Sequence, residues 1–103
     1  MEVVFNNLYL ERIFEGKKVL GKPKYGKEVI VKFKKTVLML QFANSVSDIK
    51  RFKGLNFEAL KGDYKGYYSV RVDIQYRLIL RLDKNQLLVD DIIVIEDLTN
   101  HYR

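Results

Sequence analysis

The sequence predicts an α+β fold, in which an N-terminal strand and two helices pack on an antiparallel sheet of four or five strands. Three observations support this prediction. The chain has 103 residues, which fits a single domain over residues 1–103. Hydrophobic residues make up 48% of it, enough for an ordinary core. Their spacing changes from helical before Gly54 to strand-like after it.

The N-terminal part of the chain is predicted to form a strand, a helix and a loop. The segment EVVF near the start is typical of a short strand. Residues 8–16, LYLERIFEG, have loosely helical spacing, with Asn6 or Asn7 as the N-cap and Gly16 as the stop. Residues 17–27 hold five lysines, two glycines and the only proline, so we expect a loop there.

A long helix is expected over residues 27–44. One helix face at the i, i+3, i+4 spacing holds Ile30, Phe33, Val37, Leu40 and Gln41, and all of these except the glutamine are apolar. The segment SVSDIKRF, residues 45–52, follows as a short helix capped by Ser45 or Ser47.

Four strands are expected after Gly54, with turns at KGDYKG, DIQ and DKNQ. They are Leu55–Leu60, Tyr67–Val72, Tyr76–Leu82 and Leu87–Ile95. The last seven residues, DLTNHYR, are too few to be stable alone, so we expect them to dock on the rest.

Composition limits the chemistry. The chain has no cysteine, which excludes disulfides and zinc–thiolate sites, and its single histidine leaves no usual zinc set, so no metal or cofactor is expected. Residues 1–66 hold 14 basic and 7 acidic residues, an excess that favours a polyanionic partner such as nucleic acid, although lysines also keep small domains soluble. No signal peptide or membrane span is evident, so we expect a soluble cytoplasmic protein.

Two arginines interrupt the strand pattern of the predicted hairpin. If the chain turns through DIQ, Val72 faces Tyr76 and Arg71 lies opposite Arg77 on one face of the sheet. A two-residue turn would put the arginines on opposite faces. Facing like charges are destabilising, so the pair favours an anion such as phosphate. The alternative is a salt bridge to a nearby carboxylate, from Glu58, Asp63 or Asp97.

The same register leads to two further expectations. We expect Val70 and Leu78 to share the face of the arginines, which would then be apolar at one end and cationic at the other. Tyrosines surround the pair and could stack RNA bases beside neutralised phosphates, namely Tyr64, Tyr67, Tyr68 and Tyr76. The alternative for Tyr68 and Tyr76 is packing in the core.

The segment FEALKGDYKGYYSVRVDIQYRLIL resembles the central segment of the RelE/ParE superfamily of toxins, and is nearest to the HigB branch. The resemblance implies a RelE-like two-layer fold and the toxin of a type II toxin–antitoxin system. It further implies a ribosome-dependent endoribonuclease that cleaves messenger RNA in the A site without a metal and so inhibits translation. The implied partners are the ribosome, messenger RNA and a cognate antitoxin, HigA-like or other, with no membrane.

The resemblance also implies site residues. Glu58 stands where HigB toxins have a histidine and where the related toxin YoeB has a glutamate that acts as general base. Arg77 matches the hairpin arginine that contacts the scissile phosphate. Arg71 and Lys61 match further basic positions, and Tyr68 belongs to the same RNA-binding strand.

The C-terminal residues match a mixture of relatives. Asp97 could fill the acidic position of the HigB ending, but Leu98 follows it rather than tyrosine. His101 and Tyr102 resemble the histidine–tyrosine ending of YoeB. The frame thus resembles HigB and the catalytic set resembles YoeB.

These residues fit RNA cleavage by the neighbouring 2′-hydroxyl, which needs a base, cations at the phosphorus and an acid at the leaving 5′ oxygen. Glu58, the two arginines and His101 supply one candidate for each. Two other functions stay open, a ParE-like inhibitor of DNA gyrase without nuclease activity and a non-catalytic RNA-binding module.

Overall fold

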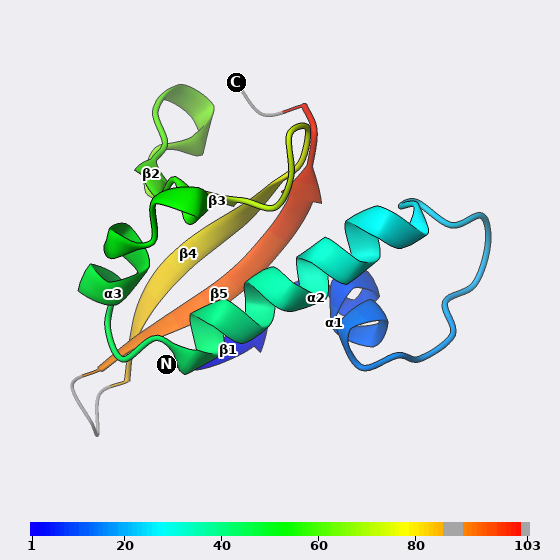
Figure 1. The fold of residues 1–103 in the computed structure, drawn as a ribbon, viewed down its shortest axis with the longest axis horizontal. Helices are drawn as coiled ribbons and strands as arrows, with labels where there is room; N and C mark the ends of the chain where they lie inside the picture. Colours follow the sequence, from blue (N-terminus) through cyan, green and yellow to red (C-terminus); the bar gives the residue numbers. More distant parts are fainter. Residues whose placement is uncertain (86–89, 102–103) are drawn as a thin grey trace.

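The computed structural model describes residues 1–85 and 90–101, and its centre is a five-stranded mixed sheet (Figure 1). The strand order is β1-β5-β4-β3-β2, in which β1 runs parallel to β5 and the other neighbours are antiparallel. The strands are β1 Glu2–Phe5, β2 Glu58–Ala59, β3 Tyr68–Arg71, β4 Arg77–Asn85 and β5 Asp90–Thr99. The predicted α+β fold is confirmed, and the N-terminal strand joins the sheet itself.

Three helices form at the places where the sequence predicts them. In α1, Leu8–Phe14, the Asn7 side chain accepts a hydrogen bond from the Leu10 amide at 3.1 Å. The long helix α2 spans Lys27–Phe42, and α3 spans Val46–Arg51. The Ser45 hydroxyl caps α3 by accepting from the amide of its third residue at 3.3 Å.

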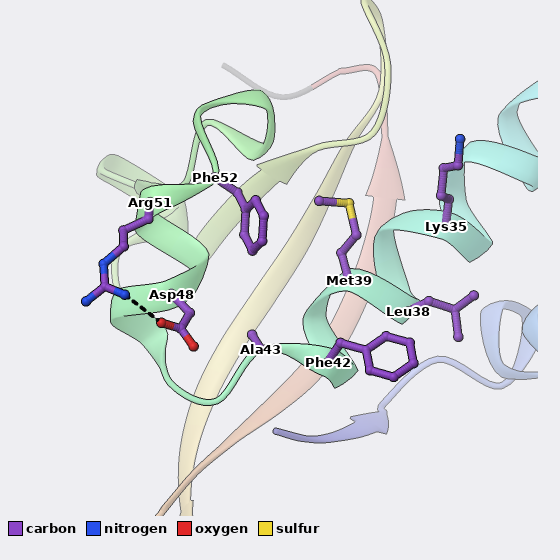
Figure 2. A pocket seen from close by; sticks show the side chains of 8 residues that line it. All are labelled: Lys35, Leu38, Met39, Phe42, Ala43, Asp48, Arg51 and Phe52. Atoms are coloured by element: carbon purple, nitrogen blue, oxygen red, sulfur yellow. Dashed lines mark hydrogen bonds and ion pairs between the residues drawn. The ribbon is translucent and has the colours of Figure 1, made fainter.

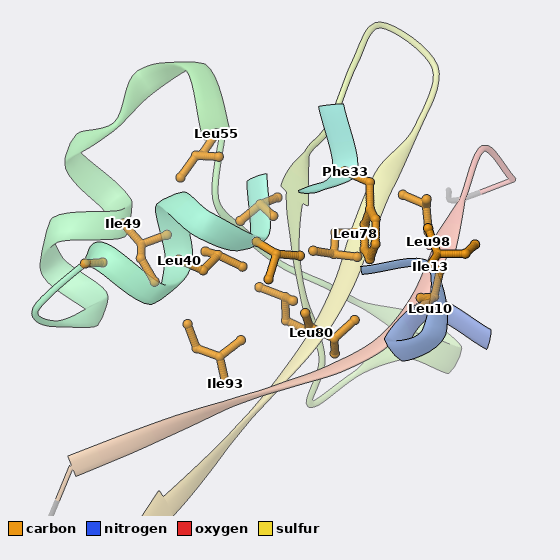
Figure 3. Close-up of a cluster of buried hydrophobic side chains, with 14 residues drawn as sticks. Leu10, Ile13, Phe33, Leu40, Ile49, Leu55, Leu78, Leu80, Ile93 and Leu98 are labelled. Atoms are coloured by element: carbon orange, nitrogen blue, oxygen red, sulfur yellow. The ribbon is translucent and has the colours of Figure 1, made fainter. Parts of the chain in front are cut away.

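One face of the sheet packs against all three helices. Figure 1 shows α2 crossing in front of β4 and β5, and Figure 3 shows the apolar side chains gathered between them. The helices contribute Leu10 and Ile13 from α1, Phe33, Val37 and Leu40 from α2, and Ile49 from α3. The strands contribute Val70, Leu78, Leu80, Ile93, Ile95 and Leu98.

The face predicted for Val70 and Leu78 is wrong. Val70 pairs with Leu78, and both are fully buried in the core beneath the helices. Because side chains alternate along a strand, Arg71 and Arg77 project from the opposite face. The buried apolar residues on the arginines' side are instead Ile79 and Val94.

Strand boundaries differ from the predicted ones near both hairpins. The predicted strand Leu55–Leu60 shrinks to two residues, because Lys53–Leu55 forms a turn of 3-10 helix and Asn56 adopts a left-handed backbone, φ 44°. In the other direction, β5 continues to Thr99 and takes in the first three of the seven tail residues that were expected to dock. The turn predicted at DKNQ is wrong for residues 83–85, which extend β4 and pair with β5, and residues 86–89 lie outside the described part of the chain. No helix within the described ranges is long and apolar enough to span a membrane.

Leu80 provides a test of the core. Its side chain is 0% exposed and packs in the central cluster, so Leu80→Ala removes buried methyl groups and leaves a cavity. We expect a loss of about 2–5 kcal/mol in the free energy of unfolding, measured by urea denaturation. Leu20→Ala is the matched control, because Leu20 is 99% exposed and its truncation leaves no cavity. Equal stability of the two variants would contradict this packing.

Candidate active site

The turn between β3 and β4 places the two arginines side by side. The Asp73 carboxylate accepts hydrogen bonds from the Gln75 and Tyr76 amides at 2.8 and 2.6 Å, and the Val72 amide donates to the Tyr76 carbonyl at 3.0 Å. This connection leaves Arg71 directly opposite its strand partner at position 77, as the three-residue turn predicts.

The Arg77 guanidinium is held from several sides. Its Nε donates to the Ser69 hydroxyl at 2.9 Å, and one Nη donates to the Asn56 carbonyl at 2.7 Å. The same nitrogen lies 3.9 Å from a Glu58 carboxylate oxygen. The Arg77 side chain is only 15% exposed, so this cation is fixed in place and not a mobile surface charge.

Glu58 lies on β2 at the edge of the sheet, next to the arginine. It pairs with Ser69 across the strands, so both side chains share the face of Arg77. The Glu58 side chain is 43% exposed, and its carboxylate accepts a hydrogen bond from the side-chain amide of Asn56 at 3.3 Å. The ion pair foreseen as the alternative to an anion site is therefore present, but it is long and leaves the carboxylate open to solvent.

The other predicted cations are exposed around this centre. The Arg71 Nε donates to the Asp73 carbonyl at 3.3 Å, and the rest of its side chain faces solvent. Lys61 is exposed and directly precedes the single turn of 3-10 helix at Gly62–Tyr64, without a side-chain hydrogen bond to it. Both can add positive potential to the site. We call Glu58, Ser69, Arg71 and Arg77 the arginine face.

The end of β5 brings the C-terminal residues to the same end of the sheet. Thr99 pairs with Arg77, and Figure 1 shows the strand ending beside the β3–β4 turn. His101 follows two residues later, exposed, with its amide donating to the Thr99 hydroxyl at 3.0 Å. Asp97 is exposed, pairs with Ile79 and accepts from the amide of the next residue at 2.8 Å. Tyr102 lies outside the described residues.

The predicted tyrosine platform is divided between different surroundings. Tyr68 stacks on Phe57 with ring centroids 5.2 Å apart, on the core side of the sheet. Tyr76 meets Tyr25 edge to face at 5.7 Å and also packs against the core. Tyr68 directly precedes Ser69 on β3, and neighbouring side chains on a strand point to opposite faces. Tyr68 therefore lies on the face opposite to Glu58 and Arg77.

Sequence reasoning missed Ser69 and Asn56. Ser69 was open to prediction, since it lies two residues before Arg71 on one strand and so shares its face. Asn56 gave no such signal, because its carbonyl reaches Arg77 across 21 residues through a left-handed turn. Within the described ranges no cluster of side chains could hold a metal ion.

The fold is similar to that of two solved structures. A YoeB/ParE toxin from Agrobacterium tumefaciens shares 20% sequence identity at a TM-score of 0.56, over 99% of this chain and 100% of that one. A YoeB–YefM complex from Staphylococcus aureus shares 23% identity at a TM-score of 0.52, over 99% and 98%. At these identities the likeness establishes the fold alone.

The family follows from a sequence model. The model of the HigB-like toxins, described as RelE-like toxins of type II toxin–antitoxin systems, matches residues 3–94, and the chain belongs to this family. The resemblance to RelE/ParE toxins, nearest to HigB, is confirmed, and the protein is a type II toxin. No curated protein matches the sequence.

Asn56 offers a test of the site's backbone. Its positive φ is tolerated by asparagine and glycine but strained for a β-branched residue. We expect Asn56→Gly to keep the carbonyl that holds Arg77, whereas Asn56→Val loses about 1–2 kcal/mol of stability in urea denaturation. A valine variant as stable as the glycine variant would rule out the left-handed turn.

Tyr25 ties the loop before α2 to β5 and predicts a pH dependence. Its hydroxyl donates to the Leu98 carbonyl at 2.7 Å, and burial, with Asp97 nearby, raises the pKa of Tyr25 to about 12. The folded state thus favours the neutral phenol. The resulting stability is complete below the unfolded-state pKa of about 10 and is lost as the pH rises toward 12.

We expect Tyr25→Phe to lose about 1 kcal/mol at neutral pH, because the Leu98 carbonyl loses its donor. The variant should also show a smaller fall in unfolding free energy than the parent between about pH 9 and about pH 11.5. Urea denaturation across this range measures both effects, with Tyr67→Phe as the control that removes a phenol elsewhere in the chain. An unchanged profile in Tyr25→Phe would exclude this phenol as the source.

Proposed function

We propose that this toxin, acting as a single domain over residues 1–103, is a ribosome-dependent endoribonuclease that cleaves messenger RNA in the A site and so inhibits translation. The observation that carries the proposal is the arrangement at Arg77. A partly buried guanidinium held by Ser69 and Asn56 lies beside a half-exposed carboxylate, Glu58, with Arg71 facing it across the hairpin. This arrangement combines a fixed cation with an accessible base.

In the proposed reaction, Glu58 takes the proton of a ribose 2′-hydroxyl. The freed oxygen attacks the adjacent phosphorus, and the bond from phosphorus to the 5′ oxygen breaks. Arg77, aided by Arg71 and Lys61, stabilises the negative charge that develops on the phosphoryl oxygens. His101 donates a proton to the departing 5′ oxygen. The products are a 2′,3′-cyclic phosphate and a 5′-hydroxyl end.

The roles of the remaining predicted residues are narrower. Tyr102, three residues beyond the last paired residue of β5 in the sequence, is proposed to orient the base or the phosphate. Asp97 is exposed on β5 near this end and is assigned only a place in the RNA-contacting surface. Tyr68 has its ring stacked on Phe57 on the core side, so we propose that it supports the strand and does not stack on RNA.

We also propose that a cognate antitoxin, HigA-like or other, binds and silences the toxin. The support is that type II toxins are defined by their antitoxins, and that one similar fold was solved as a YoeB–YefM complex.

The nuclease proposal is tested by mapping messenger RNA ends after induction of the toxin. We expect cleavage in frame with codons, with 5′-hydroxyl ends, and a loss of about 10²–10⁴-fold for Glu58→Gln and for His101→Gln. Glu15→Gln, on an exposed glutamate paired with Lys17, is the matched control and should cleave normally. Intact transcripts together with altered DNA supercoiling would contradict the nuclease proposal and indicate a gyrase inhibitor.

Ser69→Ala tests how Arg77 is positioned. The substitution removes the hydroxyl that accepts from the Arg77 Nε and leaves the guanidinium less constrained. We expect cleavage to fall about 10-fold or more with little change in ribosome binding. A misplaced Arg77 stabilises the transition state less well, whereas ribosome binding does not depend on its exact position. Measurement of single-turnover cleavage and ribosome co-sedimentation separates the two, and equal losses in both would count against a positioning role.

Ribosome dependence has its own test. Proton removal from a ribose hydroxyl needs the base and the attacking oxygen held in line, so we expect the positioning of the RNA by the ribosome to contribute several kcal/mol of the activation. Purified toxin should cleave messenger RNA bound in the A site of a ribosome at least ~10³-fold faster than the same transcript without ribosomes. Comparable cleavage rates on both substrates would contradict the proposed dependence on the ribosome.

A further inference from the structure

The outer side of α2 carries an apolar row that the core does not use. Val31, Leu38 and Phe42 are 63%, 44% and 83% exposed, and they follow one another at the spacing of a single helix face, with Lys35 between the first two. We call these four residues the α2 stripe. Exposed aromatic and aliphatic side chains in a continuous row are typical of a contact surface.

The stripe borders a groove between α2 and α3. The groove has a volume of ≈ 600 Å³ and is lined mainly by apolar side chains. Figure 2 shows Met39 and Phe52 pointing toward one another across it, and Leu38 and Phe42 next to each other on another side of α2. Phe52, which ends α3, is 49% exposed. Thus the surface is both hollow and apolar.

The charges around this surface are mostly positive. Helix α2 carries four lysines and one glutamate, and Lys35 lines the groove. On the α3 side, Arg51 binds Asp48 at 3.0 Å, but 77% of its side chain remains exposed. A second hollow, toward the start of α2, is lined by two lysines, one glutamate and one residue of the stripe, namely Lys27, Lys32, Glu28 and Val31.

We propose that the α2–α3 groove and the α2 stripe bind an amphipathic helix of a partner protein whose apolar face is flanked by carboxylates. The distance from Val31 to Phe42 is about 16 Å along the helix axis, which matches three turns of a partner helix. Apolar anchors at i, i+4 and i+7 would meet the stripe, and acidic flanks would meet Lys35 and Arg51.

The charge disfavours self-association through this face. A second copy of this chain docked through the same face would bring two Lys35 side chains and two sets of α2 lysines together, and facing like charges oppose association. An acidic helix gains from the same lysines. The inference does not depend on the nuclease chemistry, because the groove lies on the helix side of the sheet and the arginine face lies on the other.

The test uses two synthetic helical peptides of about 18 residues with leucines at heptad a and d positions. One has glutamate at the flanking e and g positions and the other has lysine, and both are titrated onto the purified toxin by fluorescence anisotropy. We expect the acidic peptide to bind at least ~10-fold tighter. The double variant Leu38→Ser with Phe42→Ser should weaken binding at least ~10-fold, and Lys35→Glu should shift the preference toward the lysine peptide.

Leu20→Ser is the matched control, because Leu20 is exposed elsewhere and should leave peptide binding unchanged. Glu58→Gln should also bind normally, and the Leu38/Phe42 variant should cleave RNA normally, so failure of this proposal is distinguishable from failure of the nuclease. Equal binding of both peptides, or binding unaffected by the double variant, would overturn it. A toxin dimer in sedimentation that dissociates in the double variant would assign the surface to self-association.

Discussion

The register of the β3–β4 hairpin is the constraint on which the site depends. Asp73 holds the turn by accepting two backbone amides, and the three-residue connection makes Arg71 face Arg77. A shift of one residue would exchange the two faces of the hairpin, burying the arginines and exposing Val70 and Leu78. One carboxylate in a turn therefore stabilises the core and the arginine face together.

The two faces of the sheet have separate tasks. The face beneath the helices is apolar and accounts for most of the core, while the other combines Glu58, Ser69 and two arginines with the buried side chains of Ile79 and Val94. A buried guanidinium needs partners for its donors, and Arg77 finds them in a hydroxyl and a backbone carbonyl. These neutral acceptors fix the guanidinium beside the Glu58 carboxylate, which lies 3.9 Å from one of its nitrogens.

The helix side of the molecule has a different chemistry from the arginine face. It carries the exposed apolar row on α2 and the groove beside α3. The RNA chemistry proposed for the arginine face and the helix binding proposed for the α2–α3 groove lie on opposite sides of the sheet. A partner bound in the groove would therefore leave Arg77 uncovered.

The order of elements, the caps at Asn7 and Ser45, the long helix and the Arg71–Arg77 register were predictable from the sequence, because they depend on local spacing and turn chemistry. The family was also predictable, because its motif lies within one short segment. The contacts of Arg77 with Asn56 and Ser69, the inward stacking of Tyr68 and the bare apolar row on α2 were decided only by the tertiary structure. These features depend on which residues distant in the chain meet in space, and no local pattern encodes that.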